Sequence, residues 1–123
     1  MSKIILVVDD DRMSLELSKR KLEEQGYQVM TAEDGRAALD CLNLKKPELI
    51  ILDVQMPDMD GYTFIIEKAK VPDFKEIPVV MLTGSAETGP LFKRHGVKGY
   101  LLKPLKLQEL LDKVSEIIGP GNA

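Results

Sequence analysis

The sequence has little of several residue types, and each scarcity excludes a class of protein. It has no tryptophan and one cysteine, Cys41, so an internal disulfide is excluded and we expect a reducing, cytoplasmic location. No apolar run approaches the roughly 18 residues that a membrane-spanning helix needs. We also expect no cleavable signal, because Ser2 and Lys3 lead directly into a strand-like run. Cys41 lies among apolar residues of a predicted helix, so we interpret it as a small buried side chain.

An excess of positive charge is also absent. The 17 basic and 20 acidic residues give a net charge of −3, and the scattered lysines form no basic stripe for nucleic acid. An apolar fraction of 44% and a charged fraction of 30% are typical of a soluble globular protein. A chain of 123 residues is the usual size of one domain. We therefore expect one domain over residues 1–118 and a linker or tail over residues 119–123.

Five short aliphatic runs alternate with longer amphipathic segments. Three of the runs are almost continuously apolar, as is typical of parallel strands that are covered on both faces. The alternation predicts an α/β fold, with a doubly wound parallel sheet and right-handed crossovers. The predicted strands are Ile4–Val8, Gln28–Thr31, Leu49–Leu52, Pro78–Leu82 and Tyr100–Leu102.

Apolar residues at helical spacing occupy most of the segments between these runs. The clearest pattern runs from Leu107 to Ile118, and Gly119-Pro120 ends it. The first helix is expected between Asp11 and Gly26, and Asp34 is a suitable cap for the second. A third pattern follows Gly61 and places four residues on its apolar face: Tyr62, Ile65, Ile66 and Ala69.

Polar residues follow the predicted strands where each would reach the edge of the sheet. Asp9, Asp10 and Asp11 follow the first strand, and Asp53 follows the third. Two carboxylates about 5 Å apart repel each other by roughly 3 kcal/mol at an effective dielectric constant near 20. Three consecutive aspartates therefore indicate either a bound cation or a helix cap with solvated neighbours. The fourth strand is followed by Thr83 and Gly84, and the fifth by Lys103.

The order of the strands decides whether these groups meet. In open parallel sheets, ligands bind beyond the carboxyl ends of the strands, where the strand order reverses. In a 2-1-3-4-5 sheet the first and third strands are neighbours, so Asp53 faces Asp9 and Asp10. In a 3-2-1-4-5 sheet another strand separates them. The residues alone leave both orders open.

Taken together, these motifs resemble the receiver domain of two-component response regulators, of the chemotaxis-regulator type, from Lys3 to Ile118. The resemblance implies a flavodoxin-like sheet in the order 2-1-3-4-5, flanked by five helices. It also implies that Asp53 accepts a phosphoryl group. The remaining roles that it implies are phosphoryl contacts from Lys103, Thr83 and Gly84, Mg²⁺ ligands at Asp9, Asp10, Asp53 and the main-chain carbonyl of Gln55 (with Mn²⁺ able to substitute), and a switch formed by Thr83 and Tyr100.

The resemblance also implies partners. The phosphoryl donor would be a sensor histidine kinase or a phosphotransfer protein, and the output would go to a downstream protein or a fused effector domain. We expect no direct contact with nucleic acid or membrane. Such a domain catalyses its own Mg²⁺-dependent phosphorylation and dephosphorylation and is not a turnover enzyme. The segment between Thr83 and Tyr100 is shorter than in most relatives, which predicts a short fourth helix from Pro90 to His95.

Other interpretations remain open for some residues and for the whole chain. Asp11 suits the cap of the first helix, and the Lys103–Pro104 bond is a candidate for the cis form. Asp58 and Asp60 are interpreted as turn and cap residues, and His95 as a cation at a helix end. Two other functions compete: a metal-dependent phosphatase working through an aspartyl-phosphate, and a receiver-fold adaptor that is never phosphorylated. The phosphatase family resembling haloacid dehalogenases carries its motifs in the reverse order.

Overall fold

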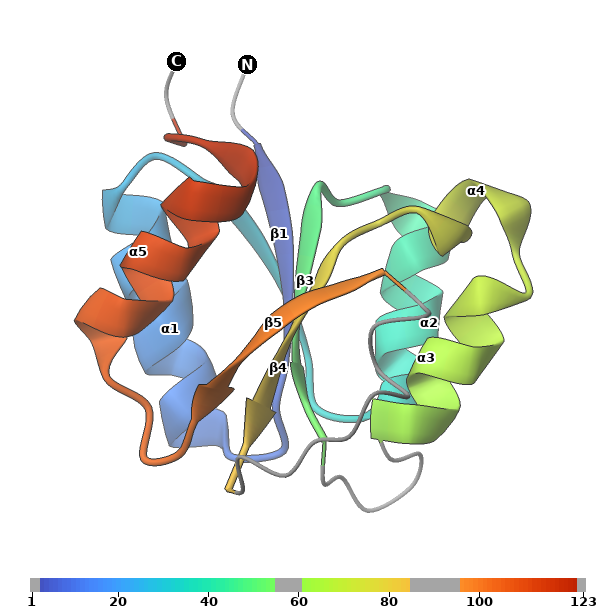
Figure 1. Cartoon of the computed structure of the whole chain (residues 1–123), viewed down its shortest axis with the longest axis horizontal. Coiled ribbons are helices and arrows are strands. Elements are labelled where there is room, and N and C mark those ends of the chain that lie inside the picture. The colour runs from blue at the N-terminus through green and yellow to red at the C-terminus, as the bar shows by residue number, and fades with distance from the viewer. Residues whose placement is uncertain (1–2, 55–60, 85–95, 122–123) are drawn as a thin grey trace.

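The computed structural model describes residues 3–54, 61–84 and 96–121, with the side chain of residue 62 excepted. Its centre is a five-stranded sheet in which all neighbouring strands are parallel, in the order β2-β1-β3-β4-β5 (Figure 1). This confirms the 2-1-3-4-5 order, so β1 and β3 are neighbours. The strands are β1 (Ile4–Val8), β2 (Gln28–Ala32), β3 (Leu49–Asp53), β4 (Val79–Thr83) and β5 (Val97–Leu102).

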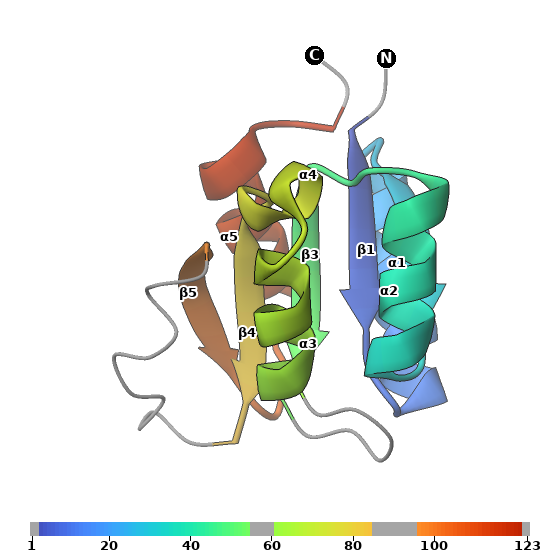
Figure 2. The same ribbon diagram turned by 90° about the vertical axis from the view of Figure 1, so that its right-hand side faces the viewer.

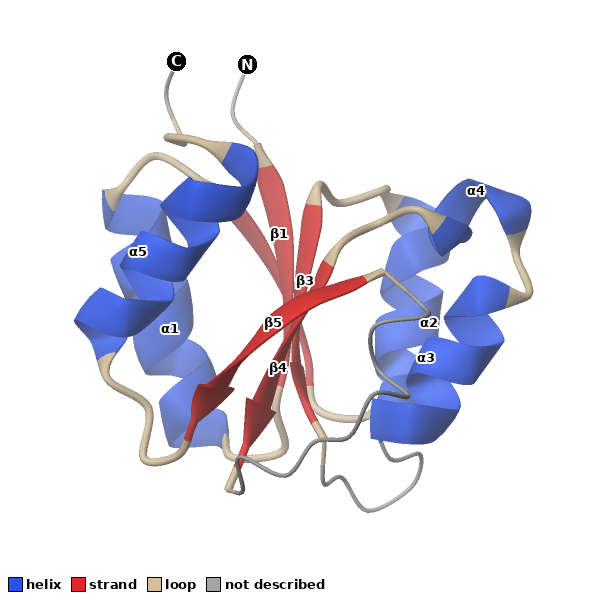
Figure 3. Cartoon of the chain, viewed as in Figure 1, coloured by secondary structure: helices blue, strands red, loops and turns tan. Residues whose placement is uncertain are grey.

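Helices cover both faces of the sheet. α1 and α5 lie on one face, and α2, α3 and the short α4 lie on the other (Figures 1 and 2). In the part of the chain that is described there are five helices, of which α3 and α4 follow each other between β3 and β4. Figure 3 shows the helices flanking the strands. Their bounds are α1 (Arg12–Glu24), α2 (Gly35–Leu44), α3 (Gly61–Ala69), α4 (Pro72–Lys75) and α5 (Leu107–Ile118). None of the helices within the described ranges is long and apolar enough to cross a membrane.

The core forms two layers because successive side chains of a strand point to opposite faces. On β1, Ile5 and Val7 pack toward α1 and α5 with Leu110 and Val114. Leu6 and Val8 of the same strand pack on the other face, toward α2 and α3. Ile50 and Leu52 of β3 belong to that second layer, with Phe64 of α3. This double coverage explains why the central strands are almost continuously apolar.

Two predicted helix caps are confirmed. The Asp11 carboxylate accepts from the main-chain amides of Met13 and Ser14, at 3.0 and 3.4 Å. The Asp34 carboxylate accepts from the amide of Ala37 at 2.8 Å. Each cap supplies an acceptor to amides that have no partner within the first helical turn. Asp11 therefore anchors the start of α1 directly beside the end of β1.

The apolar face predicted for α3 is partly wrong. Ile66 is 51% exposed, whereas Phe64 is fully buried. Each helical residue turns by about 100°, so Phe64, Ile65 and Lys68 share the face toward the sheet, and Ile66 lies on the opposite side. Lys68 is fully buried, which the apolar pattern did not reveal.

The segments after β3 and β4 differ in part from the predicted elements. The short helix α4 lies between α3 and β4, where no helix was predicted, because four residues carry too little periodicity to detect. The helix predicted from Pro90 to His95 lies outside the described residues, as do Gln55, Asp58 and Asp60. β5 begins at Val97, three residues earlier than predicted. The Lys103–Pro104 peptide bond is cis, as suggested.

Residues that follow α5 pack against the rest of the domain. The Tyr27 hydroxyl donates to the carbonyl of Gly119 at 2.6 Å. The Lys3 ammonium donates to the carbonyls of Ile118 and Pro120. Gly121 is buried against the turn that precedes β2, where a Cβ atom would lie 2.6 Å from the carbonyl oxygen of Gln25. These contacts are at the end of the sheet opposite the predicted site (Figure 1).

Candidate functional site: an acidic cluster at the carboxyl edge of the sheet

Three carboxylates from two strands converge at the carboxyl edge of the sheet. Val8 of β1 is paired with Leu52 of β3, so Asp9 and Asp53 are the next residues of neighbouring strands. One carboxylate oxygen from each of Asp9, Asp10 and Asp53 lies within 4.8 Å of the others. Asp9 and Asp53 are both 2% exposed, and Asp10 is exposed. The structure therefore brings together the three acidic side chains that the sequence predicted as metal ligands.

The environment of Asp9 disfavours its charge. Burial, together with a smaller contribution from the nearby negative charge of Asp53, raises the pKa of the Asp9 carboxyl to about 6. The main-chain amide of Asp11 donates to Asp9 at 2.9 Å and opposes this effect only in part. A buried carboxylate with this environment gains more from a bound cation than from water.

Asp11 caps a helix and does not belong to the acidic cluster. Its carboxylate accepts from the Ser14 hydroxyl at 3.1 Å, which lowers the pKa of Asp11, and it caps α1. The triplet thus divides its roles: Asp9 and Asp10 face Asp53, while Asp11 holds the start of the helix. The reading of Asp11 as a cap is confirmed.

Lys103 directly follows the edge strand β5 and adds a positive charge to this group of carboxylates. Its ammonium nitrogen lies 3.1 Å from Oδ2 of Asp53. The side chain is positioned by the end of β5, because the amide of Lys103 donates to the carbonyl of Thr83 at 2.8 Å. An ammonium at this distance offsets part of the repulsion among the carboxylates and can pair with a second anion beside Asp53.

Thr83 and Gly84 end β4 between these groups. Thr83 is buried. The residue before it, Leu82, is paired with Asp53 on the neighbouring strand β3. Gly84 is exposed, and a Cβ atom built on it would meet no atom within 4 Å. Local packing therefore does not require glycine at this position. Tyr100 lies on the neighbouring edge strand β5 and is 44% exposed.

The donor set fits a hard divalent cation. Mg²⁺ prefers oxygen ligands and keeps several waters, so one or two carboxylates are sufficient to hold it. Here two buried carboxylates and one exposed carboxylate lie close enough to share one ion. The groups beside the ion site are a lysine and a buried hydroxyl, which can contact the oxygens of an anion. The arrangement suits the binding of a phosphoryl group next to Asp53.

Comparisons with known proteins agree with this geometry. The family model described as response regulator receiver domain matches residues 5–115. The response regulator MprA of Mycolicibacterium vanbaalenii is 37% identical over 116 residues, which cover 93% of this chain and 49% of that protein. The regulatory protein PhoP for alkaline phosphatase synthesis in Bacillus subtilis is 38% identical over 122 residues, covering 96% and 49%. The chain spans about half the length of these curated relatives.

Solved structures share the fold over nine tenths or more of their length. The chemotaxis protein CheY4 of Vibrio cholerae has a TM-score of 0.85 at 33% identity, covering 96% of this chain and 100% of that one. The receiver domain of the sensor histidine kinase PA1611 from Pseudomonas aeruginosa, at 27% identity and a TM-score of 0.85, covers 97% and 99%. That structure has a magnesium ion coordinated in its active-site cleft. With its acidic cluster, its sheet order and a family match over residues 5–115, this chain belongs to the response regulator receiver domains of two-component signalling.

Proposed function

We propose that the chain is a phosphoacceptor whose acceptor is Asp53, with a phosphohistidine of a sensor histidine kinase or phosphotransfer protein as donor. One observation carries this proposal. Asp53 is buried at the end of β3, and one of its carboxylate oxygens lies within 4.8 Å of a carboxylate oxygen of Asp9 and of Asp10. Its Oδ2 atom lies 3.1 Å from the ammonium nitrogen of Lys103. A receiver domain is a signalling module and not a turnover enzyme, so this chemistry sets a state of the protein.

The transfer needs no general base. An ionised Asp53 already carries the lone pair that attacks phosphorus, so an O–P bond forms as the P–N bond to histidine breaks. The electron pair of that bond returns to nitrogen, and a donor ring protonated on its other nitrogen leaves as neutral histidine. Lys103 can follow the phosphoryl oxygens as a point charge, and the Thr83 hydroxyl and the Gly84 amide can donate to them. Attack of water on phosphorus in the product breaks the new bond and restores Asp53.

A divalent cation is part of this proposal. We assign its ligands to Asp9, Asp10, Asp53 and the main-chain carbonyl of Gln55, with Mg²⁺ as the cofactor and Mn²⁺ as a substitute. A bound cation supplies the positive charge that offsets the repulsion between these carboxylates and the incoming phosphoryl group. The presence of magnesium in the PA1611 receiver domain supports this choice.

The output is proposed to pass through Thr83 and Tyr100. When Thr83 turns toward the phosphoryl oxygens, it leaves space next to β5, and Tyr100 moves from its exposed position into that space. Phosphorylation would bias an existing equilibrium, and a change from 1:99 to 99:1 requires about 5.5 kcal/mol. The Tyr100 ring signals should change on phosphorylation in the wild type and should stay unchanged in Thr83→Ala.

The wider setting is also a proposal. We place the domain at residues 1–118 with a tail over 119–123, in the cytoplasm, and we propose that its output goes to a downstream protein or a fused effector domain. Neither nucleic acid nor membrane is expected to contact this domain directly. The family match does not favour an aspartyl-phosphate phosphatase. A full set of acidic, hydroxyl and lysine groups argues against an adaptor that is never phosphorylated.

Intact-mass spectrometry tests the acceptor. After incubation with phosphoramidate and Mg²⁺, the wild-type protein should gain one phosphoryl group, and excess chelator should prevent the gain. Asp53→Asn should remove the adduct, because an amide is not a nucleophile of this kind. Asp40→Asn is the matched control, since Asp40 is an exposed aspartate on α2. An unchanged adduct in Asp53→Asn would contradict the assignment.

A further inference from the structure

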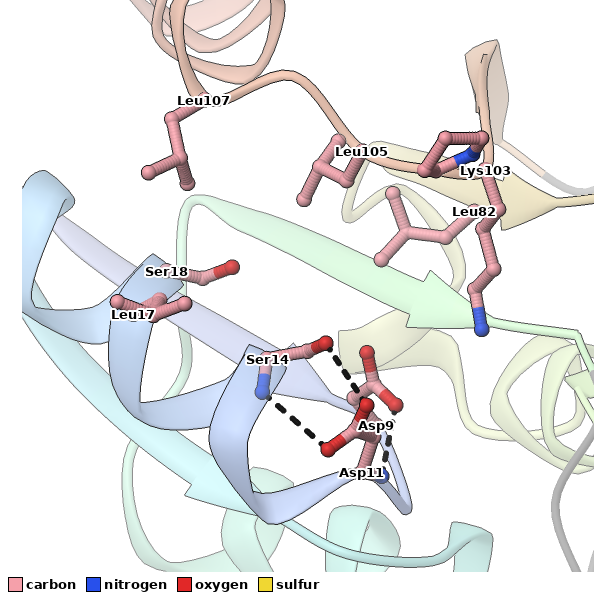
Figure 4. A pocket seen from close by; sticks show the side chains of 10 residues that line it. Asp9, Asp11, Ser14, Leu17, Ser18, Leu82, Lys103, Leu105 and Leu107 are labelled. Carbon is pink, nitrogen blue, oxygen red and sulfur yellow. Dashed lines mark hydrogen bonds between the residues drawn. The ribbon is translucent and has the colours of Figure 1, made fainter.

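A groove of about 410 Å³ opens between α1 and the connection from β5 to α5. Its mouth meets the acidic cluster at Asp9 and Lys103, and it continues along α1 away from that cluster (Figure 4). The volume is in the range of small-molecule sites. Apolar side chains of α1, β4, α5 and the connection before α5 form half of its lining: Leu17, Leu82, Pro104, Leu105 and Leu107.

A buried hydroxyl points into this groove. Ser18 is 3% exposed, and its oxygen is directed from α1 toward the space beside Leu105 (Figure 4). Within the described residues, this hydroxyl has no hydrogen-bond partner, whereas the Ser14 hydroxyl donates to Asp11. Its oxygen is not among the fully buried unsatisfied atoms of the described residues, so the hydroxyl opens onto the groove, where a bound polar group can take the place of water. Ser18 lies two helical turns, about 10 Å, from Asp11 along the same face of α1.

The mouth of the groove attracts a cation. Asp9 and Asp11 line it, and Asp10 and Asp53 lie beside Asp9. The cation that lines the groove is Lys103, which is already paired with Asp53 at 3.1 Å. Without a divalent cation at the cluster, an anionic ligand would face repulsion here, while a neutral ligand would leave the carboxylates unused.

We propose that this groove binds a small amphipathic amine, with its cationic end at Asp9 and Asp11, its apolar body against the leucines, and a polar group at Ser18. Such a molecule joins an acidic mouth, an aliphatic wall and a buried hydroxyl that are all present in one continuous space. The inference does not depend on phosphoryl transfer, and only its competition with Mg²⁺ rests on the proposed role of Asp9 as a metal ligand. Because the amine and Mg²⁺ would share Asp9, each should weaken the binding of the other by the same factor.

Tyramine is a suitable probe, because it has an ammonium at one end and a phenol at the other. Titration of the metal-free protein, followed by amide chemical shifts, should show saturable changes at Leu17, Ser18 and Leu105. A ligand of this size is expected to bind with a Kd of about 1 mM. Phenethylamine, which lacks the hydroxyl, should bind roughly 2- to 10-fold more weakly. Tyrosol, which has no ammonium, should bind more weakly still.

Variants locate the contact. Ser18→Ala should remove the preference for tyramine over phenethylamine, and the matched control Ser115→Ala, on α5, should keep it. Leu17→Ser shortens the wall at a partly exposed position, so it should weaken both amines without unfolding the protein. Shifts confined to Asp9–Asp11, equal binding of tyrosol, or a preference that survives Ser18→Ala would each overturn the proposal. Saturating Mg²⁺ should reduce tyramine binding, and an unchanged Kd would also overturn it.

Discussion

At the scale of single residues, two buried ionisable groups outside ordinary ion pairs make the protein sensitive to pH. Asp9 is buried among carboxylates at the carboxyl edge of the sheet, and Lys68 is buried beneath α4 at the opposite end. Burial raises the pKa of Asp9 to about 6 and lowers the pKa of Lys68 to about 8. In both cases the environment favours the neutral form, but only Asp9 lies where a cation can reverse this preference.

Magnesium affinity should therefore fall in acid. A metal ligand must be deprotonated, and Asp9 takes up a proton as the pH falls through about 6. Below that pH the apparent affinity should approach a tenfold loss per pH unit. Isothermal titration calorimetry between pH 8 and pH 5 measures this, and Asp9→Asn should bind more weakly with a flatter profile. An affinity that is constant down to pH 5 would show that Asp9 is not a ligand.

Lys68 should make the protein more stable in alkaline solution. Its folded pKa of about 8 lies below the ordinary value of 10.5, so the unfolded chain binds more protons between these values. Its contribution to the free energy of unfolding should thus rise with pH in that window, by up to about 1.4 kcal/mol per unit. Urea unfolding at several pH values measures the slope. Lys68→Met should abolish it, and Lys70→Met, at an exposed lysine, should retain it.

At the scale of elements, aliphatic runs located the strands well because the central strands are buried on both faces. The edge strand β5 was predicted too short, since Val97-Lys98-Gly99 has no continuous apolar run. Capping chemistry identified the starts of α1 and α2 at Asp11 and Asp34. In α3, hydrophobicity alone did not distinguish Ile65 from Ile66, which differ by 100° of helical rotation.

The start of α3 offers a prediction about the site. The amide of Gly61 donates to the carbonyl of Val54 at 3.1 Å. A Cβ atom on Gly61 would lie 2.8 Å from Cα of Val54 and 3.0 Å from the carbonyl oxygen of Asp53. Gly61→Ala should therefore lower the free energy of unfolding by about 1–3 kcal/mol.

Gly84→Ala is the control for this change. A Cβ atom there would meet nothing within 4 Å, so stability should change by less than about 0.5 kcal/mol. Urea unfolding of both variants measures the difference. Equal stability of the two variants would contradict the account of α3 packing on the backbone of the acceptor strand.

At the scale of the whole molecule, the residues located the functional groups, while the resemblance supplied the strand order. Acidic residues after β1 and β3 could be found in the sequence, but only the 2-1-3-4-5 order places Asp53 beside Asp9. The groove at Ser18 was not predicted, because it is formed by α1 together with the segment after β5. Such a groove depends on how distant segments pack together, so no pattern within one segment of the sequence predicts it.

Metal binding should stabilise the whole fold. Since unfolding separates Asp9 from Asp53, Mg²⁺ binds the native state, and a concentration of 100 times its Kd should add about 2.7 kcal/mol. For a domain of this size the melting temperature should rise by several degrees. Calorimetry with and without Mg²⁺ tests this, and Asp53→Asn should reduce the rise, while Asp40→Asn should not. A rise of equal size in all three proteins would mean that the ion binds elsewhere.

The central claim is that Asp53 itself receives the phosphoryl group, and chemical trapping tests it most directly. Borohydride reduces an aspartyl-phosphate to homoserine, whereas it leaves free aspartate unchanged. After phosphorylation with Mg²⁺, reduction and peptide mapping, homoserine should be found at position 53 and should be absent when Mg²⁺ is chelated. Homoserine at position 9 or 10, or a phosphorylated protein with aspartate unchanged at position 53, would contradict the account.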